Sequence, residues 1–426
     1  MADIHQLAQM FKELDDQLVG CMRCGMCQAV CPVFAQSGRE ADVTRGKIAL
    51  LEGLANEMLT DPEGVNDKLN RCLLCGTCQA NCPSGVKVMD IFLKARAIMT
   101  GYFGLSPVKK AIFRGMLKNP RLFNMLIDMG SKFQGVFTKK QDDLLGSSCA
   151  RFNAPVIGDR HFTALADKPL HKIVPELNTP AGKSGIKVAF YVGCVIDKIF
   201  PHVGQAILEV LERHGVGVYM PKGQACCGIP VLSSGDTDTF NTLVGMNVDV
   251  LRSGEYDYLV TGCASCTSTI KELWPTMYKG ASARQFDIAN IARKTMDISQ
   301  FLVDVLKVAP REGGGRTVTY HDPCHLKNGL GITAQPRNLI RAAGCEFKEM
   351  NEAGTCCGCG GSFNLAHYEL SKKIGGRKAD NVVASGADIV ATSCPACMMQ
   401  LTDMLSRKKA GIGVKHVIEL YADGCR

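Results

Sequence analysis

The C-terminal part of the chain alternates two kinds of apolar pattern. Buried strands are predicted by short runs rich in β-branched and aromatic residues, such as KVAFYVGC and RTVTYHDPC. Helices are predicted by the longer runs between them, such as HVGQAILEVLERHG, where apolar residues recur at helical spacing. Strands that alternate with helices form parallel sheets covered by helices, so residues 186–426 are expected to be α/β.

The N-terminal part shows a different pattern. Its most periodic run, TRGKIALLEGLANEML, has helical spacing, so a mainly α-helical domain is predicted for residues 1–100. Residues 101–185 are predicted as a basic amphipathic helical connector that continues as irregular chain (APVIGDRHF, ELNTPAGKSG). Between Gly101 and Lys140 it carries eight Lys or Arg against one acid, Asp128. This segment therefore holds most of the net charge of +8, which argues against a general nucleic-acid-binding surface.

Cysteines mark an internal repeat in the α/β part. One set is repeated at offsets of 130, 130, 130, 131 and 131 residues: Cys194, Cys226, Cys227, Cys263 and Cys266, then Cys324, Cys356, Cys357, Cys394 and Cys397. The repeat predicts two domains, 186–310 and 311–426, joined at the glycine-rich loop REGGGR and related by pseudo-two-fold symmetry. In both, the cysteines follow strands, at the sheet edge where α/β proteins place their ligands.

The first 100 residues contain eight further cysteines in two identical motifs, Cx2Cx2Cx3CP. In two-cluster ferredoxins, this spacing wraps three thiolates around one [4Fe–4S] cluster and sends the fourth to the other cluster. One predicted ligand set is therefore Cys21, Cys24, Cys27 and Cys82, and the other is Cys72, Cys75, Cys78 and Cys31. A pair of zinc sites is the alternative, although zinc usually closes with two CxxC pairs.

The chain has 22 cysteines, and its first residues lack the basic start and apolar block of a signal peptide. We therefore expect a cytoplasmic protein whose thiols bind metal rather than form disulfides. No GxGxxG unit or CxxCH motif is present in the sequence, so no flavin, nicotinamide or c-type haem site is expected in this chain.

The two repeats, Cx31CCGx35CxxC and Cx31CCGx36CxxC, resemble the CCG domains of heterodisulfide reductase catalytic subunits. Similar domains occur in the iron–sulfur subunits of glycolate oxidase, D-lactate-oxidising complexes and anaerobic glycerol-3-phosphate dehydrogenase. The segments YHDPCH and ATSCPACMMQL resemble the glycolate oxidase iron–sulfur subunits in particular. The 40 residues between Cys31 and Cys72 resemble the α-helical ferredoxin domain of succinate dehydrogenase iron–sulfur subunits. The resemblance covers nearly the whole chain, and Cys359 in CCGCGG departs from the pattern. We expect His321, His325 and Cys359 to add polar or soft groups around the second repeat.

The resemblance implies one or two further [4Fe–4S] clusters in the CCG domains, of a noncubane type, with zinc or a cubane cluster as alternatives. It implies an electron-transfer subunit of a 2-hydroxyacid (glycolate or D-lactate) dehydrogenase complex, in which FAD is held by a partner chain. Two alternatives remain open. The chain would be a heterodisulfide reductase-like catalytic subunit, or it would pass electrons to quinone or another electron-transfer protein, with the basic helix in peripheral contact with the inner face of the membrane.

Overall fold

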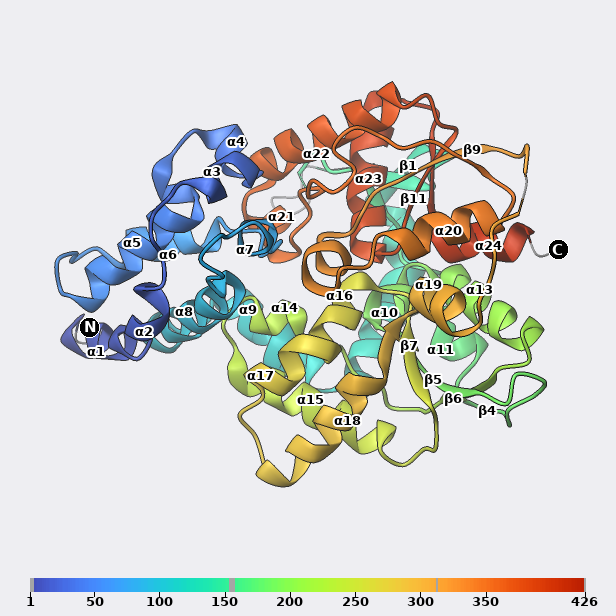
Figure 1. The fold of residues 1–426 in the computed structure, drawn as a ribbon, viewed down its shortest axis with the longest axis horizontal. Helices are drawn as coiled ribbons and strands as arrows, with labels where there is room; N and C mark the ends of the chain where they lie inside the picture. Colours follow the sequence, from blue (N-terminus) through green and yellow to red (C-terminus); the bar gives the residue numbers. More distant parts are fainter. Residues whose placement is uncertain (1–3, 153–157, 312, 425–426) are drawn as a thin grey trace.

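The structure is a computed structural model that describes residues 4–152, 158–311 and 313–424. A helical N-terminal domain lies at one end, and two α/β domains lie beside each other at the other end (Figure 1). The described residues contain no helix that is both long and apolar enough to cross a membrane.

The N-terminal domain contains helices and no strand between Ile4 and Phe103. Apolar positions on its longer helices build a core that includes Leu7, Phe11, Leu51 and Phe92, all fully buried or nearly so. The mainly α-helical prediction is thereby confirmed. Its helices are α1 (Ile4–Lys12), α2 (Asp15–Leu18), α3 (Met26–Val30), α4 (Phe34–Ser37), η1 (Glu40–Asp42), α5 (Thr44–Ala55), α6 (Pro62–Asn70), α7 (Thr77–Ala80) and α8 (Val88–Phe103).

The connector is mostly helical in its first half. The helices α9 (Pro107–Lys110), η2 (Ala111–Leu117) and α10 (Pro120–Phe137) lead into an antiparallel sheet of β1 (Thr138–Asp142), β2 (Ser147–Ala150) and β3 (Phe162–Thr163). The segment expected to be irregular, APVIGDRHF, begins outside the described residues and ends in β3. A short helix, α11 (Leu170–Ile173), completes the connector before the first α/β domain.

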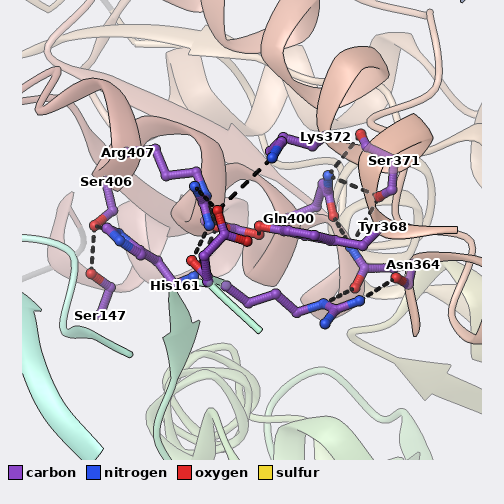
Figure 2. Close-up of polar contacts among 12 residues, drawn as sticks. Ser147, His161, Asn364, Tyr368, Ser371, Lys372, Gln400, Ser406 and Arg407 are labelled. Carbon is purple, nitrogen blue, oxygen red and sulfur yellow. Dashed lines mark hydrogen bonds and ion pairs between the residues drawn. The ribbon is translucent and has the colours of Figure 1, made fainter. Parts of the chain in front are cut away.

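Polar contacts fasten this small sheet to the second α/β domain (Figure 2). Ser147 Oγ lies 2.7 Å from Ser406 Oγ, and His161 Nδ1 lies 2.8 Å from the same oxygen. The backbone N–H of His161 donates to Asp403 Oδ1 at 3.0 Å, and Arg407 Nε donates to that carboxylate at 2.9 Å. The connector thus links the helical domain to the second α/β domain.

The first α/β domain has a five-stranded sheet in the order β4-β6-β5-β7-β8, with β4 antiparallel and the others parallel. Its strands are β4 (Leu177–Asn178), β5 (Lys187–Tyr191), β6 (Gly217–Met220), β7 (Tyr258–Thr261) and β8 (Thr295–Asp297). Its helices are α12 (Cys194–Lys198), α13 (Pro201–Arg213), α14 (Ile229–Leu232), α15 (Thr237–Leu251), α16 (Ala264–Ser268), η3 (Thr269–Leu273), α17 (Trp274–Met277), η4 (Ser282–Arg284), α18 (Gln285–Lys294), α19 (Ile298–Gln300) and η5 (Phe301–Val305).

The second α/β domain repeats this topology. Its parallel sheet has the order β10-β9-β11-β12, which matches β6-β5-β7-β8 strand for strand. The duplication predicted from the cysteine spacing is therefore present in the fold. The elements are β9 (Thr317–Tyr320), η6 (His325–Gly329), α20 (Ala334–Ala342), β10 (Glu346–Phe347), α21 (Ser362–Ala366), α22 (Tyr368–Ala384), β11 (Ile389–Thr392), α23 (Pro395–Lys408), β12 (Gly413–His416) and α24 (Val417–Gly424).

Candidate iron–sulfur centres

The two ferredoxin motifs form similar tight loops. Arg23 and Gly25 in the first motif, and Leu74 and Gly76 in the second, have positive φ angles between 53° and 88°. Glycine adopts this left-handed conformation without steric cost, whereas other residues are strained in it. The same backbone turn therefore occurs twice, and each turn curls three cysteines around one pocket.

Each pocket also receives the last cysteine of the other motif. Cys82 lines the first pocket, together with Cys21, Cys24, Cys27 and Cys78. Cys31 lines the second pocket, together with Cys72, Cys75 and Cys78. The structure thus brings together the four cysteines of each predicted set, and Cys78 lies between the two pockets. Their role as ligands in this crossed arrangement is what we propose for them.

The environment of these thiols suits a bound cation. Burial raises the pKa of Cys31 to about 12, and it also raises the pKa of Cys72. A hydrogen bond with Cys356, together with burial, holds the pKa of Cys75 well above its usual value. Without a metal these thiols would keep their protons, and binding of iron would displace them. A donor set of cysteines in two four-residue groups fits two [4Fe–4S] clusters.

In the first α/β domain, all five repeat cysteines lie at the carboxyl end of the sheet, after β5, β6 and β7. The Sγ atoms of Cys194 and Cys226 are 3.9 Å apart. Thiol–thiol contacts continue from Cys226 to Cys227, from Cys227 to Cys266 and from Cys266 to Cys263. The predicted ligands of this repeat therefore form one continuous cluster of sulfur atoms.

The second α/β domain contains the equivalent cluster after β9, β10 and β11. Cys324 contacts Cys356, and the Sγ atoms of Cys357 and Cys397 are 3.4 Å apart. Cys394 hydrogen-bonds to Cys397 and closes the set. Five thiolates exceed the four ligands that a single zinc ion accepts, so the donor set fits a polynuclear iron–sulfur cluster better.

The cysteine sites touch one another across the domain boundaries. Cys75 of the second ferredoxin pocket contacts Cys356, and Asn328 Nδ2 donates to the carbonyl of Cys75 at 2.9 Å. Cys263 of the first repeat contacts Cys394 of the second, and Ser265 Oγ lies 3.8 Å from Cys394 Sγ. The four sites therefore form a line: first ferredoxin pocket, second ferredoxin pocket, second repeat, first repeat.

Polar residues hold this line together, including His325, which the sequence placed near the second repeat. His325 Nδ1 lies 3.0 Å from Ser265 Oγ of the first repeat, and His325 Nε2 lies 3.4 Å from the carbonyl of Leu74 in the ferredoxin domain. The backbone N–H of Ala264 donates to the carbonyl of Ser393 at 3.0 Å and ties the two CxxC loops together. These contacts join segments that are far apart in the sequence, so no local motif predicts them.

The far end of the line opens into a cavity of about 580 Å³. Cys194 and Cys226 line it, and α10 and α11 contribute the opposite wall. Its polar residues include His171, whose Nδ1 lies 2.9 Å from Asp197 Oδ1, and Lys198, which pairs with the same carboxylate. Among the four sites, the first repeat is thus the one beside the large cavity.

Of the remaining cysteines, Cys149 and Cys345 lie apart from this line, whereas Cys359 lies beside the second repeat. Cys149 is half-buried on β2, where Gln141 Nε2 donates to its sulfur, and Cys345 is half-buried in the turn before β10. Cys425 lies outside the described residues. Cys359 packs beside Cys357, Cys394 and Cys397. Its predicted status as an extra soft group near the second repeat agrees with this placement.

Known protein families match the same regions. A 4Fe-4S dicluster domain matches residues 17–86, which include all eight N-terminal cysteines, and the cysteine-rich CCG domain matches residues 188–271 and 318–402. The probable glycolate oxidase iron-sulfur subunit of Bacillus subtilis is 30% identical over 94% of this chain and 92% of its own length.

Other relatives share part or most of this arrangement. A fumarate reductase (CoM/CoB) subunit of Methanothermobacter marburgensis is 28% identical over 95% of this chain and 72% of its own length. Lactate utilization protein A of Bacillus licheniformis is 32% identical over 55% of this chain and 98% of its own length. The chain therefore belongs to the family of oxidoreductase iron–sulfur subunits that join a 4Fe-4S dicluster domain to two CCG domains, the family of the glycolate oxidase iron-sulfur subunit.

Proposed function

We propose that this chain is the electron-transfer subunit of a flavin-dependent 2-hydroxyacid dehydrogenase complex that oxidises glycolate or D-lactate. The observation that carries the proposal is the line of four cysteine sites, which runs without interruption through three domains. The names of the glycolate oxidase and lactate utilization relatives support the substrate class. A partner would bind FAD and the hydroxyacid, because this chain has no dinucleotide-binding motif.

Single-electron transfer is the chemistry that iron–sulfur clusters supply when they are bound. The protein's own contribution is to hold the sites close together and to balance their charge. The buried ammonium group of Lys47 lies near Cys31 and Cys72, and the buried guanidinium group of Arg96 also lies near Cys72. Both cations would offset the negative charge of the thiolates in the second ferredoxin pocket.

The test is anaerobic reduction of the chain in complex with its co-purified flavoprotein partner. Glycolate or D-lactate should bleach the visible iron–sulfur absorption and produce the electron paramagnetic resonance signals of reduced clusters. A Cys149→Ser variant is a matched control, because Cys149 lies apart from all four sites, and it should behave like the wild type. Reduction of the partner's flavin while every cluster in this chain stays oxidised would overturn the proposal.

One observation favours a second function, in which the first repeat itself handles a substrate. The cavity of about 580 Å³ reaches Cys194 and Cys226, and its wall carries Lys198 and His171. The name of one relative, a fumarate reductase (CoM/CoB) subunit, places it with enzymes of a reductive reaction. A disulfide substrate would enter this cavity. Rapid reoxidation of the dithionite-reduced chain by a small disulfide, lost in a Lys198→Met variant, would support this function over the first.

We also propose that α10 contacts an anionic membrane surface. Met125, Met129, Phe133 and Phe137 recur at helical spacing on α10, and each is more than half exposed. The exposed Arg121, Lys132, Lys139 and Lys140 flank this stripe. Apolar side chains that enter the headgroup boundary, with lysines that attract anionic lipid, are what an interfacial helix requires.

The membrane proposal predicts co-sedimentation with anionic vesicles at low salt and weaker binding at high salt. Replacing Met129 and Phe133 with Ser should abolish binding while the iron content stays unchanged. Arg114 is a poor choice for this test because it pairs with Asp236 of the first α/β domain at 3.2 Å. Failure of the cluster-loaded wild type to bind at low salt would rule out membrane contact by the chain alone.

A further inference from the structure

His321 occupies an unusual position beside the second repeat. It follows β9 directly, and its backbone N–H donates to the carbonyl of Ala391 at 2.9 Å, which continues the ladder between β9 and β11. The side chain is completely buried. Within the described residues, neither Nδ1 nor Nε2 makes a hydrogen bond of normal geometry; the carbonyl of Ala353 interacts with the ring, but it already accepts from Lys378 Nζ and from the backbone N–H of Asp322. Buried polar atoms are nearly always hydrogen-bonded, so the buried ring of His321 suggests a bound partner that is not part of the polypeptide.

The neighbouring protein groups are already engaged. Asp322 accepts two hydrogen bonds from the guanidinium group of Arg337, at 2.7 and 2.9 Å. The ammonium group of Lys378 donates to the carbonyls of Glu352 and Ala353. Neither charged neighbour is therefore available to pair with the ring of His321.

The ring of His321 lies beside the cysteine cluster of the second repeat. One ring nitrogen of His321 and the Sγ atoms of Cys357 and Cys397 all lie within 4.8 Å of one another. A neutral imidazole keeps a lone pair on one ring nitrogen, which can bind a metal ion. A neutral imidazole beside cysteine thiolates is a metal-binding arrangement.

The first repeat lacks this feature. The residue equivalent to His321, 130 positions earlier, is Tyr191. Tyr191 is also completely buried, but its hydroxyl donates to the carbonyl of Ala225 at 2.6 Å and is satisfied. The fold therefore does not require an unpaired polar group at this position, and the unpaired imidazole is particular to the second repeat.

We propose that His321 is a nitrogen ligand to iron in the second repeat, so that the two CCG sites bind their clusters with different ligand sets. The inference rests on the proposed presence of a cluster at that site. The first repeat would offer thiolates alone, and the second would offer thiolates and one imidazole. Because imidazole ligands raise reduction potentials relative to thiolates, the second-repeat site should have the higher potential of the two.

The test uses the complete chain, purified anaerobically from cells that were supplied with nitrogen-labelled histidine. Pulsed electron paramagnetic resonance of the reduced protein should reveal a strong histidine nitrogen coupling on the second-repeat signal, and the coupling should change with the isotope. It should disappear in His321→Gln and persist in His325→Gln. His325 is the matched control because it lies beside Cys324 but already has partners in Ser265 and Leu74.

A His321→Cys variant covers the case in which His321→Gln loses the cluster altogether. A thiolate at this position should preserve the iron content and lower the reduction potential of the second-repeat site. A second-repeat signal without histidine coupling would overturn the inference and leave the proposed function intact. Zinc, or no metal, in the second repeat would overturn the inference and the four-site relay together.

Discussion

Arg96 is predicted to stabilise the contact between the ferredoxin domain and the first α/β domain. Its guanidinium group is almost completely buried and donates to three carbonyl oxygens, those of Leu69 at 2.9 Å, Cys72 at 2.7 Å and Ser233 at 2.8 Å. The first two belong to the ferredoxin domain and the third to the α/β domain. One side chain therefore fixes both the domain contact and the backbone of a proposed iron ligand.

The cost of Arg96→Met follows from these bonds. A hydrogen bond to a charged group contributes about 1.5–3 kcal/mol, and three carbonyls would lose their donor. Methionine also removes the desolvation penalty of a buried guanidinium, which offsets part of the loss. We expect a net destabilisation of about 3–5 kcal/mol, together with loss of iron from the second ferredoxin pocket.

The assay is anaerobic denaturant unfolding, followed by circular dichroism and by visible iron–sulfur absorption. A matched control is Thr100→Val, which removes one neutral hydrogen bond to the carbonyl of Ser234 (2.9 Å) at the same interface and should cost about 1 kcal/mol. Equal unfolding midpoints for the Arg96 and Thr100 variants, with full iron content in both, would refute the reasoning.

Four further substitutions test single residues. Cys82→Ser should damage the cluster held mainly by Cys21, Cys24 and Cys27, and loss of the Cys72–Cys75–Cys78 signal in electron paramagnetic resonance would contradict the crossed ligand arrangement. Cys357→Ala should abolish or alter the second-repeat cluster and leave the ferredoxin signals unchanged, and Cys359→Ala should have a milder effect. Unchanged iron content and electron transfer in Cys357→Ala would refute the role of Cys357 as a ligand. Asn328→Ala removes hydrogen bonds to the carbonyl of Cys75 and to Thr77 Oγ1, so electron transfer between the ferredoxin domain and the second repeat, measured by rapid-freeze spectroscopy, should slow while the iron content stays constant.

The sequence predicted the parts of this architecture that depend on spacing. Cysteine offsets of 130 and 131 residues revealed the duplication, and equivalent strands then appear in the same sheet order. The ferredoxin spacing brought Cys31 and Cys82 to the expected pockets. These features are local, or repeat a local pattern, and so they can be recognised without a structure.

Contacts between domains could not be predicted in this way. Cys75 approaches Cys356, and Cys263 approaches Cys394, because folded domains pack against one another. The periodicity of the sequence does not predict how those domain surfaces meet. The short strands β1 and β2 (TKKQD and SSCA) were also missed, because their polar residues lack an apolar alternation and their pairing depends on attachment to α23. His321 was recognised only as a polar neighbour, since its lack of a partner becomes visible only when the surrounding atoms are placed.

The metal content of the anaerobically purified chain tests the central claim most directly. Four sites that each hold a four-iron cluster would contain about 16 iron atoms per chain, with matching acid-labile sulfide and no zinc. About eight iron atoms with two zinc ions per chain would contradict the account, because the CCG domains would then carry no redox centre and the line of cysteine sites could not act as a relay.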